Sequence, residues 1–174
     1  GIVDVEEIDN KICKDTLVVS VMHVNNEIGS VQPIEKISKI CKKKGVYFHS
    51  DAVQSFCKIS INVKKLGVDL MSVSGHKINA PKGVGFLYID KNVSISPLLD
   101  GGGQEKGLRS GTLNVPGIVG LSEAVRLDRD ISEISSSRNK LIEGVLGIPG
   151  SRLNGSRNER RSEEHTSELQ SLLI

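Results

Sequence analysis

The chain has 174 residues, of which 37% are apolar and 25% are charged, so its composition is that of one ordinary domain with a core of its own. Its net charge of +2 is too small to indicate nucleic-acid binding, no apolar run approaches the roughly 20 residues of a membrane span, and no signal-peptide pattern opens it. Aromatic residues make up only 3%, with no Trp, which predicts an aliphatic core.

Both ends indicate a sequence taken from a longer one. It begins at Gly1 rather than Met, which suggests that the natural start is missing. Residues 161–174 have no useful apolar periodicity and resemble a translated sequencing adapter, so we expect a non-native tail that contributes nothing to the fold. This tail holds one Arg and three Glu, a net of −2, so the rest of the chain carries +4.

The three cysteines argue against both a zinc site and a disulfide framework. Cys13, Cys41 and Cys57 are odd in number, widely spaced and without a C-x-x-C pair. We therefore expect no metal site and a reducing compartment, the cytoplasm, with each cysteine serving as a small buried apolar side chain.

The first half of the chain predicts a strand followed by a helix. Residues 1–15 are mixed and acidic, with a turn signal at Asp9-Asn10. Residues 16–24 are a near-continuous apolar run rich in β-branched side chains, which predicts a buried parallel strand. The following helix opens at Pro33 and closes at Gly45, and its apolar positions are Ile34, Ile37, Ile40 and Cys41.

Three more strands are predicted at residues 46–49, 68–73 and 85–89, with one helical turn at 62–66. The order strand, helix, strand, short helix, strand, strand favours an α/β sheet with helices packed on it. A long amphipathic helix is predicted from Pro116 to about Val145, with a weak point at residues 135–137, which are all serine.

A glycine-rich loop at residues 101–112 precedes that helix. Glycines allow left-handed backbone angles and can turn N–H groups toward an anion, but a surface hinge loop has the same composition. The loop alone does not decide between the two.

Polar side chains follow three of the predicted strands. They are Asn25 and Asn26, then Asp51 and Gln54, then Ser74, His76 and Lys77. Adjacent parallel strands would bring them to one edge of the sheet, where open α/β sheets bind ligands. Lys77 there is either a Schiff-base nucleophile or a solvated loop lysine. A lysine, a carboxylate and an anion cradle are what a pyridoxal 5′-phosphate enzyme needs.

Four motifs in unbroken order resemble the cysteine desulfurases, which are enzymes of the class V aminotransferase fold that use pyridoxal phosphate. The motifs are HVNNEIG at residues 23–29, HSDAVQS at 49–55, SGHK at 74–77 and GGGQEKGLRSGT at 101–112. The resemblance runs from about Thr16 to Ala124. It implies that residues 1–160 are part of the large, cofactor-binding domain of a fold-type I pyridoxal-phosphate transferase, with a mostly parallel sheet and flanking helices.

The resemblance also implies roles for individual residues. Lys77 is similar to the lysine that holds the cofactor as a Schiff base. Asp51 is similar to the carboxylate that keeps the pyridine nitrogen protonated, and Gln54 to the residue that hydrogen-bonds the phenolic oxygen. Ser74 and His76 match ligands of the cofactor phosphate.

Two further roles lie at the edges of the site. Asn26 matches a residue near the cofactor oxygen and the substrate carboxylate. Thr112 resembles a phosphate ligand that reaches in from the other subunit, which implies a homodimer. The implied reaction takes sulfur from L-cysteine, leaving L-alanine and an enzyme persulfide that passes sulfur to an acceptor or scaffold protein for iron-sulfur cluster assembly or another sulfur-transfer pathway.

Other features of the family are not matched. Its ring-stacking histidine, catalytic cysteine and substrate-carboxylate arginine have no counterpart in these residues, and none of the three cysteines takes the catalytic role. His23 and His49 match strand residues of the family, and we expect them to be structural. A selenocysteine lyase or related lyase of the same fold, and a truncated chain without activity of its own, remain alternatives.

Overall fold

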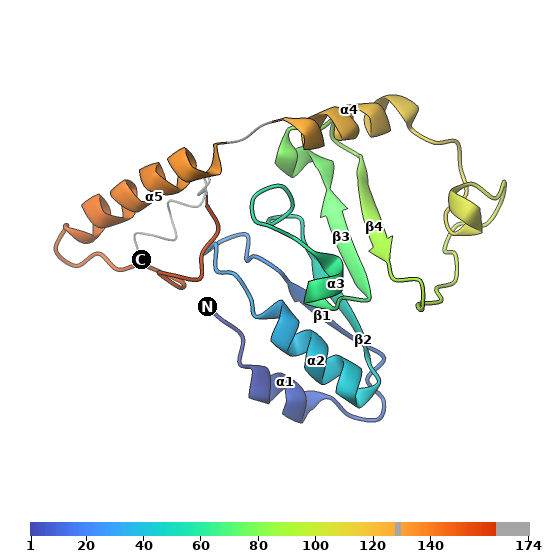
Figure 1. The fold of residues 1–174 in the computed structure, drawn as a ribbon, viewed down its shortest axis with the longest axis horizontal. Coiled ribbons are helices and arrows are strands. Elements are labelled where there is room, and N and C mark those ends of the chain that lie inside the picture. The colour runs from blue at the N-terminus through green and yellow to red at the C-terminus, as the bar shows by residue number, and fades with distance from the viewer. Residues whose placement is uncertain (128–129, 163–174) are drawn as a thin grey trace.

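The computed structural model describes residues 1–127 and 130–162, and its centre is a four-stranded sheet in the order β1-β2-β3-β4 (Figure 1). The strands are β1 (Val18–Met22), β2 (Tyr47–Asp51), β3 (Leu70–Ser74) and β4 (Gly85–Ile89). The first three run parallel, and β4 pairs antiparallel with β3. The predicted mostly parallel sheet with flanking helices is confirmed.

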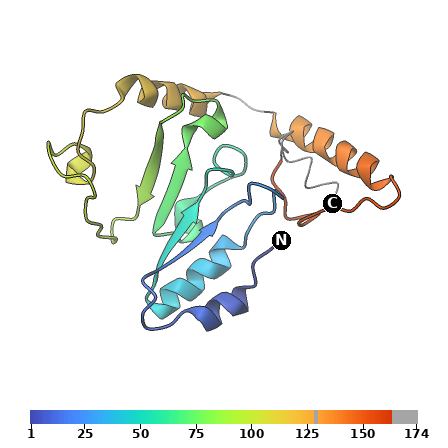
Figure 2. The same ribbon diagram turned by 180° about the vertical axis from the view of Figure 1, so that it is seen from behind.

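The helices before β3 lie together on one side of the sheet (Figures 1 and 2). They are α1 (Val5–Lys11), α2 (Ile34–Lys44) and α3 (Val63–Leu66); α2 packs on β2, and α1 and α3 pack on α2. The later elements are the short 3-10 helices η1 (Gly75–Ile78) and η2 (Glu105–Gly107) and the helices α4 (Val115–Arg126) and α5 (Ile131–Leu146). Helix α4 packs on η1, directly after β3.

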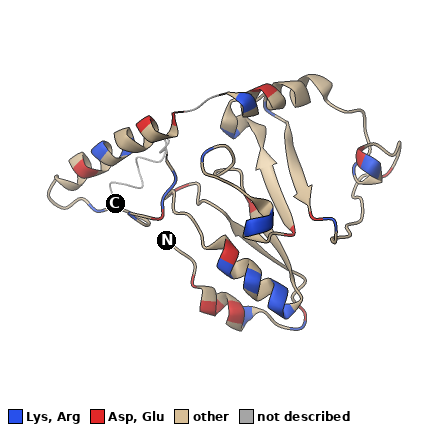
Figure 3. Cartoon of the chain, viewed as in Figure 1, with Lys and Arg blue, Asp and Glu red and all other residues tan. Residues whose placement is uncertain are grey.

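Helix α2 forms where its sequence predicts. Glu35 lies in its first turn and the lysines of residues 42–44 in its last, which complements the helix dipole (Figure 3). Gly45 ends it in the left-handed conformation, at a φ of 69° that side chains with a Cβ rarely adopt. Its buried face, which includes Ile34 and Ile37, points at the sheet.

The main core lies between α2 and one face of the sheet. Because side chains alternate along a strand, Phe48 and Ser50 of β2 point into this core, and His49 and Asp51 point to the opposite face. Phe48 is fully buried in a cluster with apolar residues of α2 and β3. The opposite face is more open, and Val18 on β1 is 45% exposed there, so the expectation that this strand is buried is wrong for one of its faces.

Two predictions of local structure are also wrong. Asp9-Asn10 is not a turn but part of α1, because Asp4 caps that helix by accepting hydrogen bonds from the backbone N–H groups of Glu6 and Glu7. The predicted long helix is two helices, α4 and α5. The break falls between Arg126 and Ile131, where Asp130 caps α5, and the serines of residues 135–137 lie within α5 without interrupting it.

The segment that was expected to be non-native begins inside the described structure. Residue 160 forms a β-bridge with Ser30, which brings the chain back onto the body. Arg161 and Ser162 are 0% and 5% exposed, so the expectation of an unpacked tail is wrong for these two residues. Residues 163–174 lie outside the described residues, and their non-native origin stays a prediction.

Of the three cysteines, Cys41 is buried as expected, whereas Cys13 is exposed and Cys57 is half-buried. None of the three forms a disulfide. Within residues 1–127 and 130–162, no three His, Cys, Asp or Glu side chains cluster in a way that could hold a metal ion. None of the helices in those ranges is both long and apolar enough to cross a membrane.

Candidate functional site

The carboxyl ends of the three parallel strands meet at one edge of the sheet. The register pairs Met22 at the end of β1 with Asp51 at the end of β2, and Asp51 with Ser72 of β3. The segments that follow these ends carry most of the predicted site residues. Their convergence at one edge was predicted from the order of the strands, and the structure confirms it.

Asp51 is the last residue of β2 and is half-buried. Its Oδ1 accepts a hydrogen bond of 2.8 Å from the backbone N–H of Val53, which fixes the carboxylate at the strand end. A carboxylate held in this way can accept a second hydrogen bond from a cationic ring nitrogen through Oδ2, and its negative charge would stabilise that cation.

Lys77 lies in η1, the 3-10 turn that starts directly after β3. Its side chain is half-buried, between the exposed His76 and the buried Ile78. Ser74 Oγ lies 2.7 Å from His76 Nδ1, so the serine and the histidine form one hydrogen-bonded pair at the strand end. The turn therefore presents an amine and two further hydrogen-bonding groups on one short stretch of backbone.

Asn25 and Asn26 form the turn after β1. Asn25 Oδ1 accepts hydrogen bonds from the backbone N–H groups of Glu27 and Ile28, so it shapes the turn. Asn26 is half-buried, and its Nδ2 donates to Glu27 Oε1 at 3.0 Å. Asn26 thus lies at the predicted edge, with its side chain turned to a neighbour in the same loop.

The two histidines of the strand motifs are held in different ways. His23, just after β1, is 4% exposed, and its Nδ1 has no hydrogen-bond partner among the described residues. Burial lowers the pKa of the His23 imidazole, which keeps the ring neutral. His49 is hydrogen-bonded through both ring nitrogens, to Ser20 and Ser72.

Gln54 is the site residue with the most unexpected partner. It is 3% exposed, and its Oε1 accepts a hydrogen bond of 2.6 Å from Nη1 of the fully buried Arg161. Arg161 is also fixed by its backbone N–H, which donates to the Gly29 carbonyl at 3.0 Å, and by Arg138, which donates to its carbonyl. Sequence reasoning missed this contact because it joins residues 107 positions apart and involves a segment set aside as non-native.

The resemblance predicts that Gln54 binds pyridoxal phosphate, so replacing Arg161 by alanine, which frees Gln54, is expected to increase the affinity for that cofactor about tenfold, the equivalent of one hydrogen bond from a charged group, ~1.4 kcal/mol. Equilibrium dialysis of the free cofactor against both proteins measures the change. Arg160→Ala is the matched control, because Arg160 is also buried but donates to the carbonyls of Asn154 and Ser156 in its own segment. An equal gain in both variants would show that loosening the segment, rather than freeing Gln54, is responsible.

Thr112 is the predicted site residue that the structure does not bring to the edge. It is exposed, in the glycine-rich loop that runs from β4 past η2 to α4 (Figure 1). Several residues of the loop have positive φ, including the non-glycine Glu105 at 52° and Lys106 at 58°. The loop thus has the left-handed geometry that its glycines predict, away from Lys77 of the same chain.

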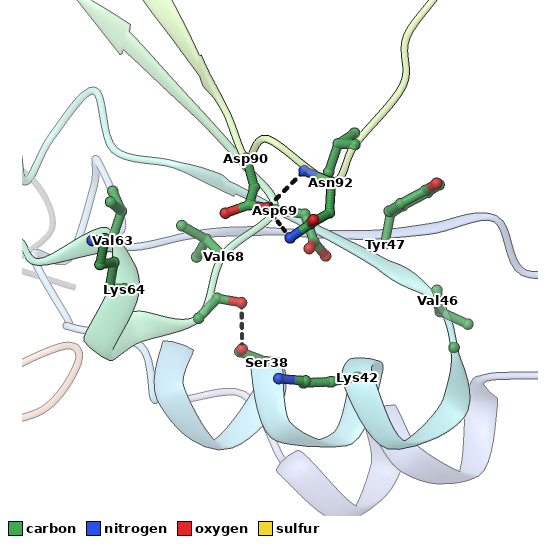
Figure 4. Close-up of a pocket in the computed structure, with 13 residues that line it drawn as sticks. Ser38, Lys42, Val46, Tyr47, Val63, Lys64, Val68, Asp69, Asp90 and Asn92 are labelled. Atoms are coloured by element: carbon green, nitrogen blue, oxygen red, sulfur yellow. Dashed lines mark hydrogen bonds between the residues drawn. The ribbon is translucent and has the colours of Figure 1, made fainter.

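A cavity of about 600 Å³ lies at the opposite end of the sheet (Figure 4). Its lining includes Tyr47 at the start of β2, Asp69 just before β3 and Asp90 just after β4. None of the predicted site residues lines it. The chemistry expected from the sequence therefore belongs to the carboxyl edge and not to this cavity.

Comparison with known proteins agrees with this arrangement. The family model described as aminotransferase class-V matches residues 1–167, and the chain belongs to that family.

Among curated relatives, the chain is 52% identical over 149 residues to the cysteine desulfurase IscS of Ehrlichia chaffeensis, covering 84% of this chain and 36% of that protein. It is 47% identical to the mitochondrial cysteine desulfurase of Saccharomyces cerevisiae, covering 92% of this chain and 34% of the yeast protein. The chain therefore spans about a third of the length of these relatives.

Solved structures of similar proteins superpose on the chain over most of its length. A NifS-like protein superposes with a TM-score of 0.85 at 42% identity, over 92% of this chain and 46% of that one. A structure of SspA in complex with cysteine superposes with a TM-score of 0.74 at 40% identity, over 82% of this chain and 42% of that one.

Proposed function

We propose that this chain is a central part of the cofactor domain of a pyridoxal-phosphate-dependent cysteine desulfurase, whose substrate is L-cysteine and whose products are L-alanine and an enzyme persulfide. The observation that carries the proposal is the convergence of Asp51 and Lys77 at the carboxyl edge of the parallel strands, with Ser74 and His76 beside the lysine. The names of the relatives support the same activity.

The residues at this edge fit the cofactor. Asp51 has an oxygen available for the ring nitrogen, Ser74 and His76 offer hydrogen bonds for the phosphate, and Lys77 supplies the amine for covalent attachment. The buried Gln54 amide would bind the phenolic oxygen, and Asn26 would lie near that oxygen and the substrate carboxylate. Pyridoxal phosphate, when bound, supplies a ring that accepts electrons from the substrate's α-carbon.

The chain's own groups would then bind, orient and move protons. Asp51 Oδ2 would hold the ring nitrogen in its protonated form through charge attraction. Lys77 Nζ would be the attachment point for the cofactor and, as a free amine, would be the base that takes the substrate's α-proton. Because Asp51 ends β2 and Lys77 follows the adjacent strand β3, the fold sets their separation.

The remaining parts of the proposal concern partners and location. Thr112, exposed on its loop, would complete the phosphate site of a second subunit, which makes the protein a homodimer. A sulfur-acceptor or scaffold protein would take the persulfide sulfur, and we expect the protein to work in the cytoplasm. The hydrogen bond from Arg161 to Gln54 favours the alternative of a chain that is inactive by itself, because it occupies a side chain that the cofactor would need.

Borohydride reduction of the chain in the presence of pyridoxal phosphate tests the proposal. The reduction makes the attachment permanent, and peptide mapping is expected to find the label on Lys77, because that amine lies beside the predicted phosphate ligands. Lys82, in the turn after η1, and Lys106, in η2, are internal controls, since both are lysines of the same chain outside the predicted site. A label on either of them instead, or one that persists in Lys77→Arg, would contradict the assignment.

A further inference from the structure

His49 joins three strands on the open face of the sheet through two short hydrogen bonds. Its Nδ1 lies 2.7 Å from Ser20 Oγ on β1, and its Nε2 lies 2.5 Å from Ser72 Oγ on β3. Ser20 is the register partner of His49, so the three side chains form a row across the sheet. The row ends at Ser72, which is also the register partner of Asp51.

Asp51 lies on the same face as His49, two residues further along β2. Ser72 is its register partner on β3. Neighbouring strands are about 4.8 Å apart, so a Ser72 hydroxyl that turned along the strand could reach the Asp51 carboxylate. In the structure this hydroxyl lies against His49, and Asp51 Oδ1 accepts from the backbone of Val53.

The tautomer of the His49 imidazole decides to which group the Ser72 hydroxyl donates its hydrogen bond. A neutral histidine has one donor nitrogen and one acceptor nitrogen. When Nδ1–H donates to Ser20 Oγ, Nε2 is the acceptor and Ser72 donates its only hydroxyl proton to it. In that arrangement Ser72 has no proton left to donate to Asp51.

We propose that His49 is a positioning residue that accepts a hydrogen bond from the Ser72 hydroxyl and thereby leaves the Asp51 carboxylate available for the cofactor's ring nitrogen. This inference rests on the proposed function, because it assigns Asp51 to that nitrogen. A hydroxyl that donates to a carboxylate stabilises its charge and weakens its attraction for a second donor. His49 therefore acts on the cofactor through Ser72 and Asp51, without touching it.

The test measures the protonation of the cofactor's ring nitrogen directly. In the chain with His49→Leu, Ser72 is released, and the ¹⁵N chemical shift of bound, ring-¹⁵N-labelled pyridoxal phosphate is expected to move toward the unprotonated value at a fixed pH. Cofactor affinity is expected to fall about tenfold, as for one weakened hydrogen bond to a charged group. Adding Ser72→Ala to His49→Leu removes the competing hydroxyl and is expected to restore both values.

Two single variants guard against a purely structural effect. In Ser20→Ala, Nδ1–H of His49 can donate to water instead, because the bond to Ser20 lies on the exposed face. The bond between His49 and Ser72 then remains, so the nitrogen signal is expected to stay unchanged. His49→Gln keeps an acceptor for Ser72 and is expected to restore part of the signal, which also covers the case in which His49→Leu does not fold. The inference would be wrong if the His49 variants lose stability in urea while the ¹⁵N signal of the cofactor does not change. It would also be wrong if the double variant, with His49→Leu and Ser72→Ala, keeps the altered signal and the lower cofactor affinity.

The cofactor site and the role of His49 can fail separately. If the unmodified chain binds no pyridoxal phosphate, the proposed function fails, and the crystal structure of the cofactor-free His49→Leu or His49→Gln chain decides the remaining question. In His49→Leu, Ser72 Oγ within hydrogen-bond distance of the Asp51 carboxylate supports the inference, whereas an Oγ turned away from it overturns it. In His49→Gln, Ser72 Oγ bonded to the amide of the introduced glutamine supports it, and Ser72 Oγ bonded to Asp51 overturns it.

Discussion

Replacing Asp51 by alanine is expected to lower turnover by at least about a hundredfold, roughly 2.7 kcal/mol of activation barrier, while cofactor attachment at Lys77 persists. The reason is that the variant loses the negative charge that would keep the ring nitrogen protonated, and with it the electron-accepting character of the ring. Alanine formation from cysteine, per bound cofactor, is the measurement. Because the chain spans about a third of its relatives, the protein for this test is a chimera in which the matched region replaces its counterpart in the Ehrlichia chaffeensis relative.

Asp90→Ala is the matched control for that experiment. Asp90 is half-buried like Asp51 and accepts a backbone hydrogen bond from the residue two positions on, at 3.0 Å, but it lies at the opposite end of the sheet. If Asp51 only caps a turn, both variants would lose about 1 kcal/mol of stability and neither would lose turnover per folded molecule. An unchanged rate in Asp51→Ala would therefore end the assignment of Asp51 to the ring nitrogen.

The strands and the gathering of the site could be predicted because both depend on short-range signals. The apolar runs at residues 16–24 and 68–73 contain β1 and most of β3, and the position of Lys77 after the latter follows from adjacency in the chain. Once three strands are parallel neighbours, the groups at their carboxyl ends meet without any further information. The role of each group came from the resemblance between motifs, and the geometry alone would have left several roles open.

The features that sequence reasoning missed depend on contacts between distant residues or on competition between local signals. The β-bridge between residue 160 and Ser30 brings Arg161 to Gln54, and this bridge cannot be predicted from the periodicity of apolar residues. The serines inside α5 looked like a helix break because serine competes for backbone hydrogen bonds, but the break occurs where Asp130 can cap the next helix. The turn signal in α1 failed for the same reason, since Asp4 supplies a stronger cap upstream.

Phe48→Ala is expected to lower the stability of the fold and to leave the cofactor site intact, whereas Asp51→Ala is expected to lower turnover. Phe48 lies on the core face of β2, is 0% exposed and packs with Ile34, Ile37 and Met71. Removing its ring leaves a cavity in a core with few aromatic side chains to refill it, so the free energy of unfolding is expected to fall by about 3–5 kcal/mol. Urea unfolding followed by circular dichroism measures the loss.

Phe86→Ala is the control, because Phe86 points to the same face from β4 but is 43% exposed and should lose clearly less. Phe48 points away from the face that carries His49 and Asp51, so the cofactor bound per folded molecule is expected to stay unchanged in Phe48→Ala. A Phe48→Ala loss no larger than that of Phe86→Ala would mean that the core does not lie between α2 and the sheet in solution. A loss of cofactor binding in molecules that remain folded would mean instead that the two faces of β2 are coupled, and that the core sets the position of Asp51 directly.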